Sequence, residues 1–439
     1  MNKELETNIK FAGLHSQWEK EMNSGLSRLF KNVRLNALEE LRVFRFPTTK
    51  DEEWRFTNVR SLLNKSFKPA VKKDGNIIDS EKFLGKYLIG DFDYNLLVFE
   101  NGFINNQFTK IEDLPEGAFI GSLSDAAKQI PEVVSEYFNK SEKEQDAFEV
   151  LNKAYVSDGL FVYLPKNKSL DRPVQVLQIA GGNEKLMVSP RNIIVAEENS
   201  EATIIVNYAG ASKSEYFNNS VTQIFGKESS RLTYVEIQSE DEKAFQIGHT
   251  LVNLNDDAVF NHFEFTLSGK LVRNNLSAKL SGENIESHYY GFYIGKNSQH
   301  IDNHTFIDHV KPNCFSNEIY KGILNDKSKA VFGGKILVDK DSQKTNAFQS
   351  NKTILLSDEA RIDTKPQLEI YADDVKCTHG ATVGQLDEEA LFYIVSRGIS
   401  KDEARSMLIN AFANDILNPI KIDALKNNLT ERILTTLRG

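Results

Sequence analysis

The feature that most constrains the fold is a long stretch of short strand-like segments, from Gly159 to Ile370. Segments such as ATIIVNYAG, RLTYVEIQS and AVFNHFEFTL are rich in β-branched and aromatic residues, and Asn, Asp, Gly and Ser separate them. Helical periodicity is absent, so the stretch predicts a large all-β unit. Sandwiches, barrels, propellers and solenoids all remain open, because no fixed-period repeat is visible. A solenoid with coils of about 20–45 residues would hold about five to ten coils here.

Helical signals lie on both sides of this all-β stretch. Before it, residues 16–44 carry apolar side chains at helical spacing, and residues 122–138 begin with a Ser/Asp cap and contain a proline. We therefore expect a mostly helical N-terminal domain over 1–155, a β domain over 156–384 and a helical C-terminal domain over 385–439. The chain is long enough for about three domains of ordinary size.

The C-terminal helices carry clear start and stop signals. Asp387 is placed to cap a helix that Gly398 ends. Ser400 and Glu403 form a capping-box pattern for a second helix, which an Asn-Pro pair at 418–419 would end, and a last amphipathic stretch follows. The face of the second helix that we expect to be buried consists of Ala404, Met407, Leu408, Ala411, Phe412 and Ile416.

Composition and charge limit the class of protein. Apolar residues make up 40% of the chain and charged residues 26%, as in folded globular proteins. The formal net charge is -9, from 53 basic and 62 acidic residues, which argues against a nucleic-acid binder. A secretory signal pattern is absent, and no apolar run approaches the ~20 residues that span a bilayer. With only two cysteines, we expect a cytoplasmic chain whose thiols stay reduced.

Two soft metal ligands, Cys377 and His379, stand one residue apart where strand-like sequence gives way to a loop before a helix. In a strand, positions i and i+2 point to the same face, and both side chains suit zinc, copper or iron–sulfur ligation. Spacing alone favours a simpler interpretation, a buried cysteine beside a hydrogen-bonded histidine. Because the chain has two cysteines, a four-cysteine cluster site would need ligands from a partner.

A second group of candidate ligands lies in the segment QHIDNHTFIDHVKPNC. It comprises His300, Asp302, His304, Asp308, His309 and Cys314. In an extended segment the first three would share one face and could form a three-ligand metal site. The spacing matches no tight motif, however, and histidine and aspartate also satisfy each other within a β structure. We therefore favour a structural role for this segment.

Several catalytic motifs are absent from the sequence. None of the glycine–lysine pairs belongs to a phosphate-binding G-x-x-x-x-G-K-[ST] loop, so nucleotide hydrolysis of that kind is excluded. The sequence also lacks a G-x-G-x-x-G that opens a helix, a G-x-S-x-G elbow and an H-E-x-x-H zinc motif. Pattern alone therefore leaves the function open.

A long block of the C-terminal third resembles a known protein family. VFGGKILVDKDSQKTNAFQSNKTILL and EARIDTKPQLEIYADDVKCTHGATVGQLDEEALFYIVSRGI are similar to the SufB/SufD family of iron–sulfur cluster assembly proteins. YKGIL, LNKAYVSDGLFVYLP and EEWRFTN extend the resemblance over most of the chain. Gly380 after the histidine and the low cysteine count resemble the SufD branch, since the SufB branch typically has a glutamate there and more cysteines.

The resemblance implies a mainly β fold, a right-handed parallel β-helix core flanked by helical N-terminal and C-terminal domains. It further implies a non-enzymatic scaffold subunit of a SufBCD complex, which assembles nascent iron–sulfur clusters for transfer to apoproteins. The β-helix would pair with a SufB-like paralogue, and the C-terminal helices would dock the SufC ABC-type ATPase. His379 matches the family's motif histidine, which is proposed to act with a SufB cysteine, and Cys377 is the second candidate ligand. The cluster would be transient and shared with SufB, and this chain alone would hold none stably.

Two other hypotheses stay open beside this one. Parallel β-helices also host carbohydrate-active enzymes, although most of these are secreted. A stand-alone module that forms a homodimer is the other alternative, because a surface that docks a paralogue can also dock a second copy of the same chain.

Overall fold

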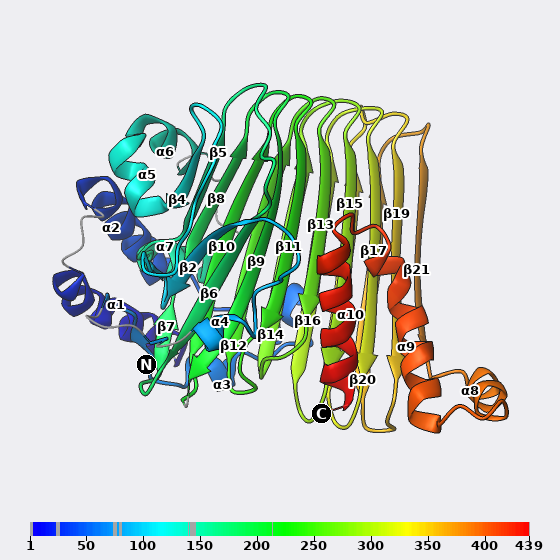
Figure 1. Ribbon diagram of the computed structural model, residues 1–439. Helices are drawn as coiled ribbons and strands as arrows, with labels where there is room; N and C mark the ends of the chain where they lie inside the picture. Colours follow the sequence, from blue (N-terminus) through cyan, green and yellow to red (C-terminus); the bar gives the residue numbers. More distant parts are fainter. Residues whose placement is uncertain are drawn as a thin grey trace.

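The centre of the molecule is a parallel β-solenoid of about 8 turns, in which successive strands alternate between two sheets (Figure 1). This computed structural model describes residues 3–22, 27–72, 77–78, 81–138, 140, 146–212 and 214–438. The predicted β-helix with helical flanks is confirmed, and the sandwich, barrel and propeller alternatives are excluded.

The two sheets are named sheet A and sheet B. In spatial order sheet A consists of β20 (Arg361–Ile370), β18 (Lys329–Val338), β16 (His300–His309), β14 (Leu271–Leu280), β12 (Phe245–Leu254), β10 (Phe217–Gly226), β8 (Arg191–Ala196), β5 (Leu160–Leu164) and β4 (Phe119–Ser122), with β7 (Leu186–Val188) beside β10 and β1 (Lys68–Pro69) beside β7. Sheet B consists of β21 (Lys376–Gly384), β19 (Asn346–Leu355), β17 (Phe315–Leu324), β15 (Glu286–Gly295), β13 (Val259–Thr266), β11 (Arg231–Ser239), β9 (Glu201–Ser212), β6 (Val174–Gly182), β2 (Asn95–Glu100) and β3 (Phe103–Ile104). Pairing is parallel except between β4 and β5 and between β2 and β3.

The length of one turn varies along the solenoid. In sheet A the step between paired residues is 26 residues over 245–271 but 32 residues over 329–361. This variation explains why no fixed repeat is visible in the sequence. The corners are held by residues that tolerate a left-handed backbone, such as Asn199, Asp257 and Asn284, with φ of 55°, 57° and 57°.

The interior of the solenoid has an apolar side and a polar side. The apolar side is a cluster that includes Val252, Ala278, Ile307 and Ile336, which stack in register along sheet A. The polar side contains buried glutamates, asparagines and glutamines, which bond mainly to one another. The side chains that point into the solenoid are therefore apolar on one side of the interior and polar on the other.

The N-terminal helices pack on the outer face of sheet A at one end of the solenoid (Figure 1). They are α1 (Lys3–Glu21), α2 (Ser27–Val43), α3 (Arg60–Leu63), α5 (Leu123–Gln129), α6 (Pro131–Phe138) and α7 (Ala147–Ala154). The 3-10 turn η1 (Glu52–Trp54) lies farther along sheet A, beside β14 and β16, and α4 (Glu81–Leu84) packs on sheet B instead. The helical signal over residues 16–44 belongs to two helices, and residues 23–26 between them lie outside the described residues. The capping signal at Ser122 is confirmed. Pro131 is the first residue of a new helix, a position that suits proline because the N–H it lacks would have no partner there. The strands β2 to β4 show that this region is not only helical.

The C-terminal helices α8 (Glu388–Val395), α9 (Lys401–Leu417) and α10 (Asp423–Arg438) follow the last turn, and α9 and α10 pack on sheet B. The Asp387 cap, the Ser400 capping box and the helix end before residues 418–419 are confirmed. Lys321 on β17 anchors α9, because its Nζ lies 2.7 Å from the Phe412 carbonyl oxygen. None of the helices formed by the described residues is long and apolar enough to cross a membrane.

The predicted buried face of α9 is partly wrong. The buried residues are Ala404, Ile409, Ala413, Ile416 and Leu417, whereas Met407 and Ala411 are exposed. Apolar residues occupy more than half of the circumference of this helix, so the sequence alone does not select one face. Contact with sheet B and α10 selects it instead.

Candidate functional site

The residue pair Cys377 and His379 lies on β21, the last strand of sheet B. Cys377 is in register with Ala347, and His379 is in register with Gln349, on the neighbouring strand β19. In the described part of the chain β21 pairs only with β19, and β20 is likewise the last strand of sheet A. Both sheets therefore end at an open edge beside this residue pair.

The two side chains share the inward face but not the same environment. Cys377 is half-buried and packs against the apolar interior, whereas His379 is exposed at the end of the solenoid. The predicted common face follows from the two-residue period of a strand. Burial raises the pKa of the Cys377 thiol, so the thiol stays protonated near neutral pH.

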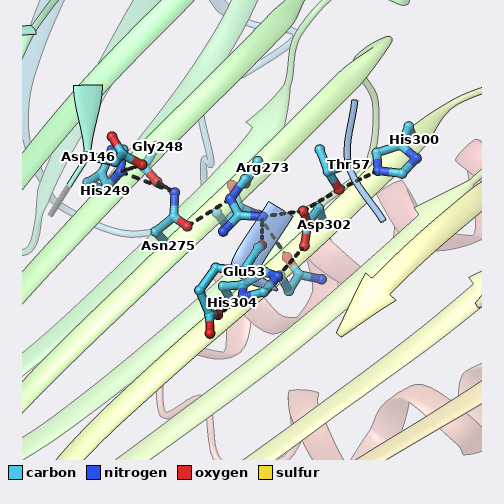
Figure 2. Close-up of polar contacts among 12 residues, drawn as sticks. Glu53, Thr57, Asp146, Gly248, His249, Arg273, Asn275, His300, Asp302 and His304 are labelled. Atoms are coloured by element: carbon cyan, nitrogen blue, oxygen red, sulfur yellow. Dashed lines mark hydrogen bonds and ion pairs between the residues drawn. The ribbon is translucent and has the colours of Figure 1, made fainter. Parts of the chain in front are cut away.

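The segment from His300 to Cys314 divides between the two faces of β16 and the corner that follows this strand. His300, Asp302 and His304 lie on the outer face of β16, as predicted for an extended segment (Figure 2). His309 is buried, with its Nε2 2.9 Å from Ser316 Oγ, and Cys314 is buried with its Sγ 3.3 Å from the Gly282 carbonyl oxygen. The six candidate ligands therefore do not form one site.

Contacts with the neighbouring strand and with the N-terminal segment fix the side chains of His300, Asp302 and His304. Asp302 Oδ2 lies 2.6 Å from Arg273 Nη1, and Asp302 Oδ1 lies 3.1 Å from His304 Nε2. The hydroxyl of Thr57 donates to Asp302 and lies 2.8 Å from His300 Nε2. Although burial alone would raise it, the pKa of Asp302 is well below its usual range because Arg273 and His304 stabilise the carboxylate. All three side chains are therefore engaged in hydrogen bonds or ion pairs within the protein.

The same band of polar contacts reaches a buried histidine that the sequence did not single out. His249 Nε2 on β12 lies 3.3 Å from Asp146 Oδ2 and 3.8 Å from Glu149 Oε1, and Asn275 links it to Arg273 (Figure 2). Among the described residues, His249, Asp146 and Glu149 form a group whose ligand atoms lie close enough together to share one ion. Burial opposes a charged imidazole, but the two carboxylates raise the pKa of His249 overall and so favour an ion pair within the group. A cavity of about 320 Å³ borders it.

Large apolar side chains are exposed at two places near the C-terminal end of the solenoid. On the open edge, Tyr371 is 63% exposed and Val383 is 46% exposed. On α8, Phe392 is 76% exposed and Tyr393 is 58% exposed. Large apolar side chains that gather on one surface mark sites where proteins associate.

Comparison with known proteins covers nearly the whole chain. Residues 178–412 match the family described as SUF system FeS cluster assembly, SufBD core domain, and residues 5–176 match the SufBD protein N-terminal region. An iron–sulfur cluster assembly SufBD family protein of Synechocystis is 32% identical, over 94% of this chain and 92% of that protein. The iron–sulfur cluster assembly protein SufD of Escherichia coli is 29% identical over 92% of both chains. SufD of Bacillus subtilis is 26% identical over 92% of this chain and 93% of that protein.

The family match and the parallel β-solenoid agree in extent, since the core match spans most of the stacked turns. The relatives are named as assembly proteins rather than as enzymes. The chain belongs to the SufBD family of iron–sulfur cluster assembly proteins.

Proposed function

We propose that this chain is a non-catalytic scaffold subunit of a SufBCD-type complex and that it pairs with a SufB-like paralogue through the open end of its β-helix. The open edge of β20 and β21 carries the proposal, because unpaired strand edges are templates for pairing with another chain. Exposed Tyr371 and Val383 on the same edge supply apolar surface for such a contact. The two free thiols suit a reducing compartment, so we place the protein in the cytoplasm.

His379 is the proposed ligand of a transient cluster shared between the two chains. Its side chain is exposed at this edge, and imidazole replaces thiolate at some cluster irons. Within the described residues His379 belongs to no group of three or more donors close enough for one ion. The remaining ligands must therefore come from the partner, and this chain alone should hold no stable cluster. The half-buried thiol of Cys377 is the second candidate ligand.

The C-terminal helices are the proposed docking surface for the SufC ABC-type ATPase. The sequence lacks a phosphate-binding loop of its own, so nucleotide hydrolysis has to come from another subunit. Exposed Phe392 and Tyr393 on α8 supply the apolar contact area.

The test measures iron and acid-labile sulfide per complex after anaerobic purification with co-expressed SufB-type and SufC-type partners. We expect His379→Ala to assemble the complex but to lose the cluster. Cys377→Ala should retain most of it. Unchanged cluster content in His379→Ala would show that this histidine ligates nothing.

The same open edge favours a homodimer when the paralogue is absent. Homologous surfaces that pair with each other are often self-complementary. Light scattering of the isolated chain at several concentrations should show a monomer–dimer equilibrium, and Val383→Lys should shift it toward monomer. A monomer at every concentration would remove this second candidate.

A further inference from the structure

A column of side chains runs along the inside of sheet B and ends at His379. Its members are in register on successive strands: Tyr234, His262, Tyr289, Glu318, Gln349 and His379. All of them except His379 are buried. The residue directly behind His379 in this column is Gln349, which is only 3% exposed.

The amide of Gln349 is oriented by the residue on its other side. Its Nε2 lies 2.9 Å from Glu318 Oε2, and Glu318 Oε1 in turn accepts from Thr305 Oγ1 at 2.5 Å. Gly334 across the interior leaves room for this amide, because a Cβ there would lie 2.4 Å from Gln349 Nε2. The donor end of the amide is therefore committed to Glu318.

The acceptor end of the same amide has no partner. Gln349 Oε1 is buried, and no described residue donates a hydrogen bond to it. An unpaired buried carbonyl oxygen is destabilising, so a donor that reaches it is favoured. His379 occupies the next position of the column, on a strand about 4.8 Å away, and a rotation of its side chain brings a ring N–H toward this oxygen.

We propose that Gln349 is a positioning residue for His379: its Oε1 accepts the N–H of one ring nitrogen and leaves the other nitrogen facing the open edge as the ligand atom. The functional half of this inference rests on the proposed role of His379 as a cluster ligand. The two imidazole nitrogens are distinct, and the hydrogen bond made by one decides which tautomer presents the other. Metal-ligating histidines are regularly held in this way by an acceptor behind them.

The chain offers a matched control on the same strand. Asn351 is two residues further along β19, faces the same interior and is fully buried, but it is in register with Ala381 instead of His379. Its amide bonds to Thr364 and accepts from Tyr293. Asn351→Leu therefore removes a buried amide beside the column without touching His379, whereas Gln349→Met removes the proposed acceptor and keeps the side-chain length.

The first experiment reads the tautomer of His379 in the full chain by ¹⁵N NMR after labelling of its eight histidines. The spectra are recorded at a pH above the ordinary imidazole range, and His379→Ala assigns the signal. We expect one dominant tautomer in the wild type and in Asn351→Leu, and a redistribution in Gln349→Met. An identical His379 signal in wild type and Gln349→Met would overturn the proposal.

The second experiment follows the rate at which a chelator removes iron from the assembled, cluster-loaded complex. Loss of a supporting hydrogen bond behind a metal ligand typically costs about 10–100-fold in affinity, so Gln349→Met should release iron about 10–100-fold faster. Asn351→Leu should match the wild type, and equal rates in all three would contradict the functional half. If His379→Ala keeps its cluster, the proposed function fails, whereas the tautomer measurement still decides the contact between Gln349 and His379.

Discussion

Arg273 and Asp302 form an ion pair in which almost no part of either side chain reaches solvent, with Arg273 Nη1 2.6 Å from Asp302 Oδ2. The guanidinium also lies 3.7 Å from the centre of the Trp54 ring and donates to the Glu53 carbonyl oxygen. The pair therefore joins two strands of sheet A to the N-terminal segment that covers them (Figure 2).

Breaking this pair should destabilise the protein strongly. We expect Arg273→Met to lower the free energy of unfolding by about 3–5 kcal/mol, because it leaves Asp302 charged and buried without its partner. The control is Lys335→Met, which removes a partly exposed pair with Glu369 and should cost at most about 1 kcal/mol. Urea denaturation measures both. Equal losses in the two variants would show that burial of the Arg273 pair has no energetic importance.

Stability should fall as the pH rises through neutrality, because the solenoid interior contains neutral glutamates. Burial, with added repulsion from Glu236, raises the pKa of Glu264 to about 8. In the unfolded chain a glutamate ionises near pH ~4.3, so above that pH the folded state holds the extra proton. The free energy of unfolding then decreases with pH by at most ~1.4 kcal/mol per unit for this group, until the folded carboxyl ionises as well.

The variant Glu264→Gln removes this group from the titration, so the decrease in stability between pH 5 and pH 8 should be shallower than in the wild type. The exposed Glu286, on the adjacent strand β15, supplies the control substitution Glu286→Gln, which should leave the slope unchanged. Urea denaturation at several pH values measures the slopes. A wild-type slope in Glu264→Gln would mean that this carboxyl is already ionised in the folded state.

A glycine inside the solenoid makes room for an aromatic ring. A Cβ on Gly291 would lie 2.1 Å from Cε1 of Tyr320, whose ring is fully buried. We expect Gly291→Ala to cost about 1–3 kcal/mol, because the interior has to shift to accept it. Gly380, on the exposed last strand, has open space at the same position, so Gly380→Ala should change stability by less than about 0.5 kcal/mol. Thermal unfolding compares the two, and a neutral Gly291→Ala would contradict the packing.

The exposed aromatic side chains of α8 should matter for association and not for folding. We expect Phe392→Ser and Tyr393→Ser each to weaken ATPase binding by about tenfold or more, because exposed aromatic residues are frequent binding hot spots. Their melting temperatures should stay at the wild-type value. Glu388→Arg, a charge reversal at the start of the same helix, tests the rim of the surface. Isothermal titration calorimetry measures the affinity of each variant for the ATPase. Unchanged affinity in both serine variants would exclude α8 as the docking site.

Local signals in the sequence determined the parts of this protein that depend on neighbouring residues. Ser400 and Glu403 define the start of α9 because a capping box needs only four consecutive residues. Cys377 and His379 share a face because a strand has a period of two. The family resemblance then supplied the β-helix, which the strand pattern alone had left undecided.

Tertiary structure decided what depends on contacts between distant segments. Asp146 and His249 are 103 residues apart, and Thr57 reaches Asp302 across 245 residues, so no local spacing could have paired them. The turns also differ in length, which hides the register that places Gln349 behind His379. Periodicity therefore indicates which residues lie on a common face of a strand, but only the stacking of unequal turns decides what that face meets.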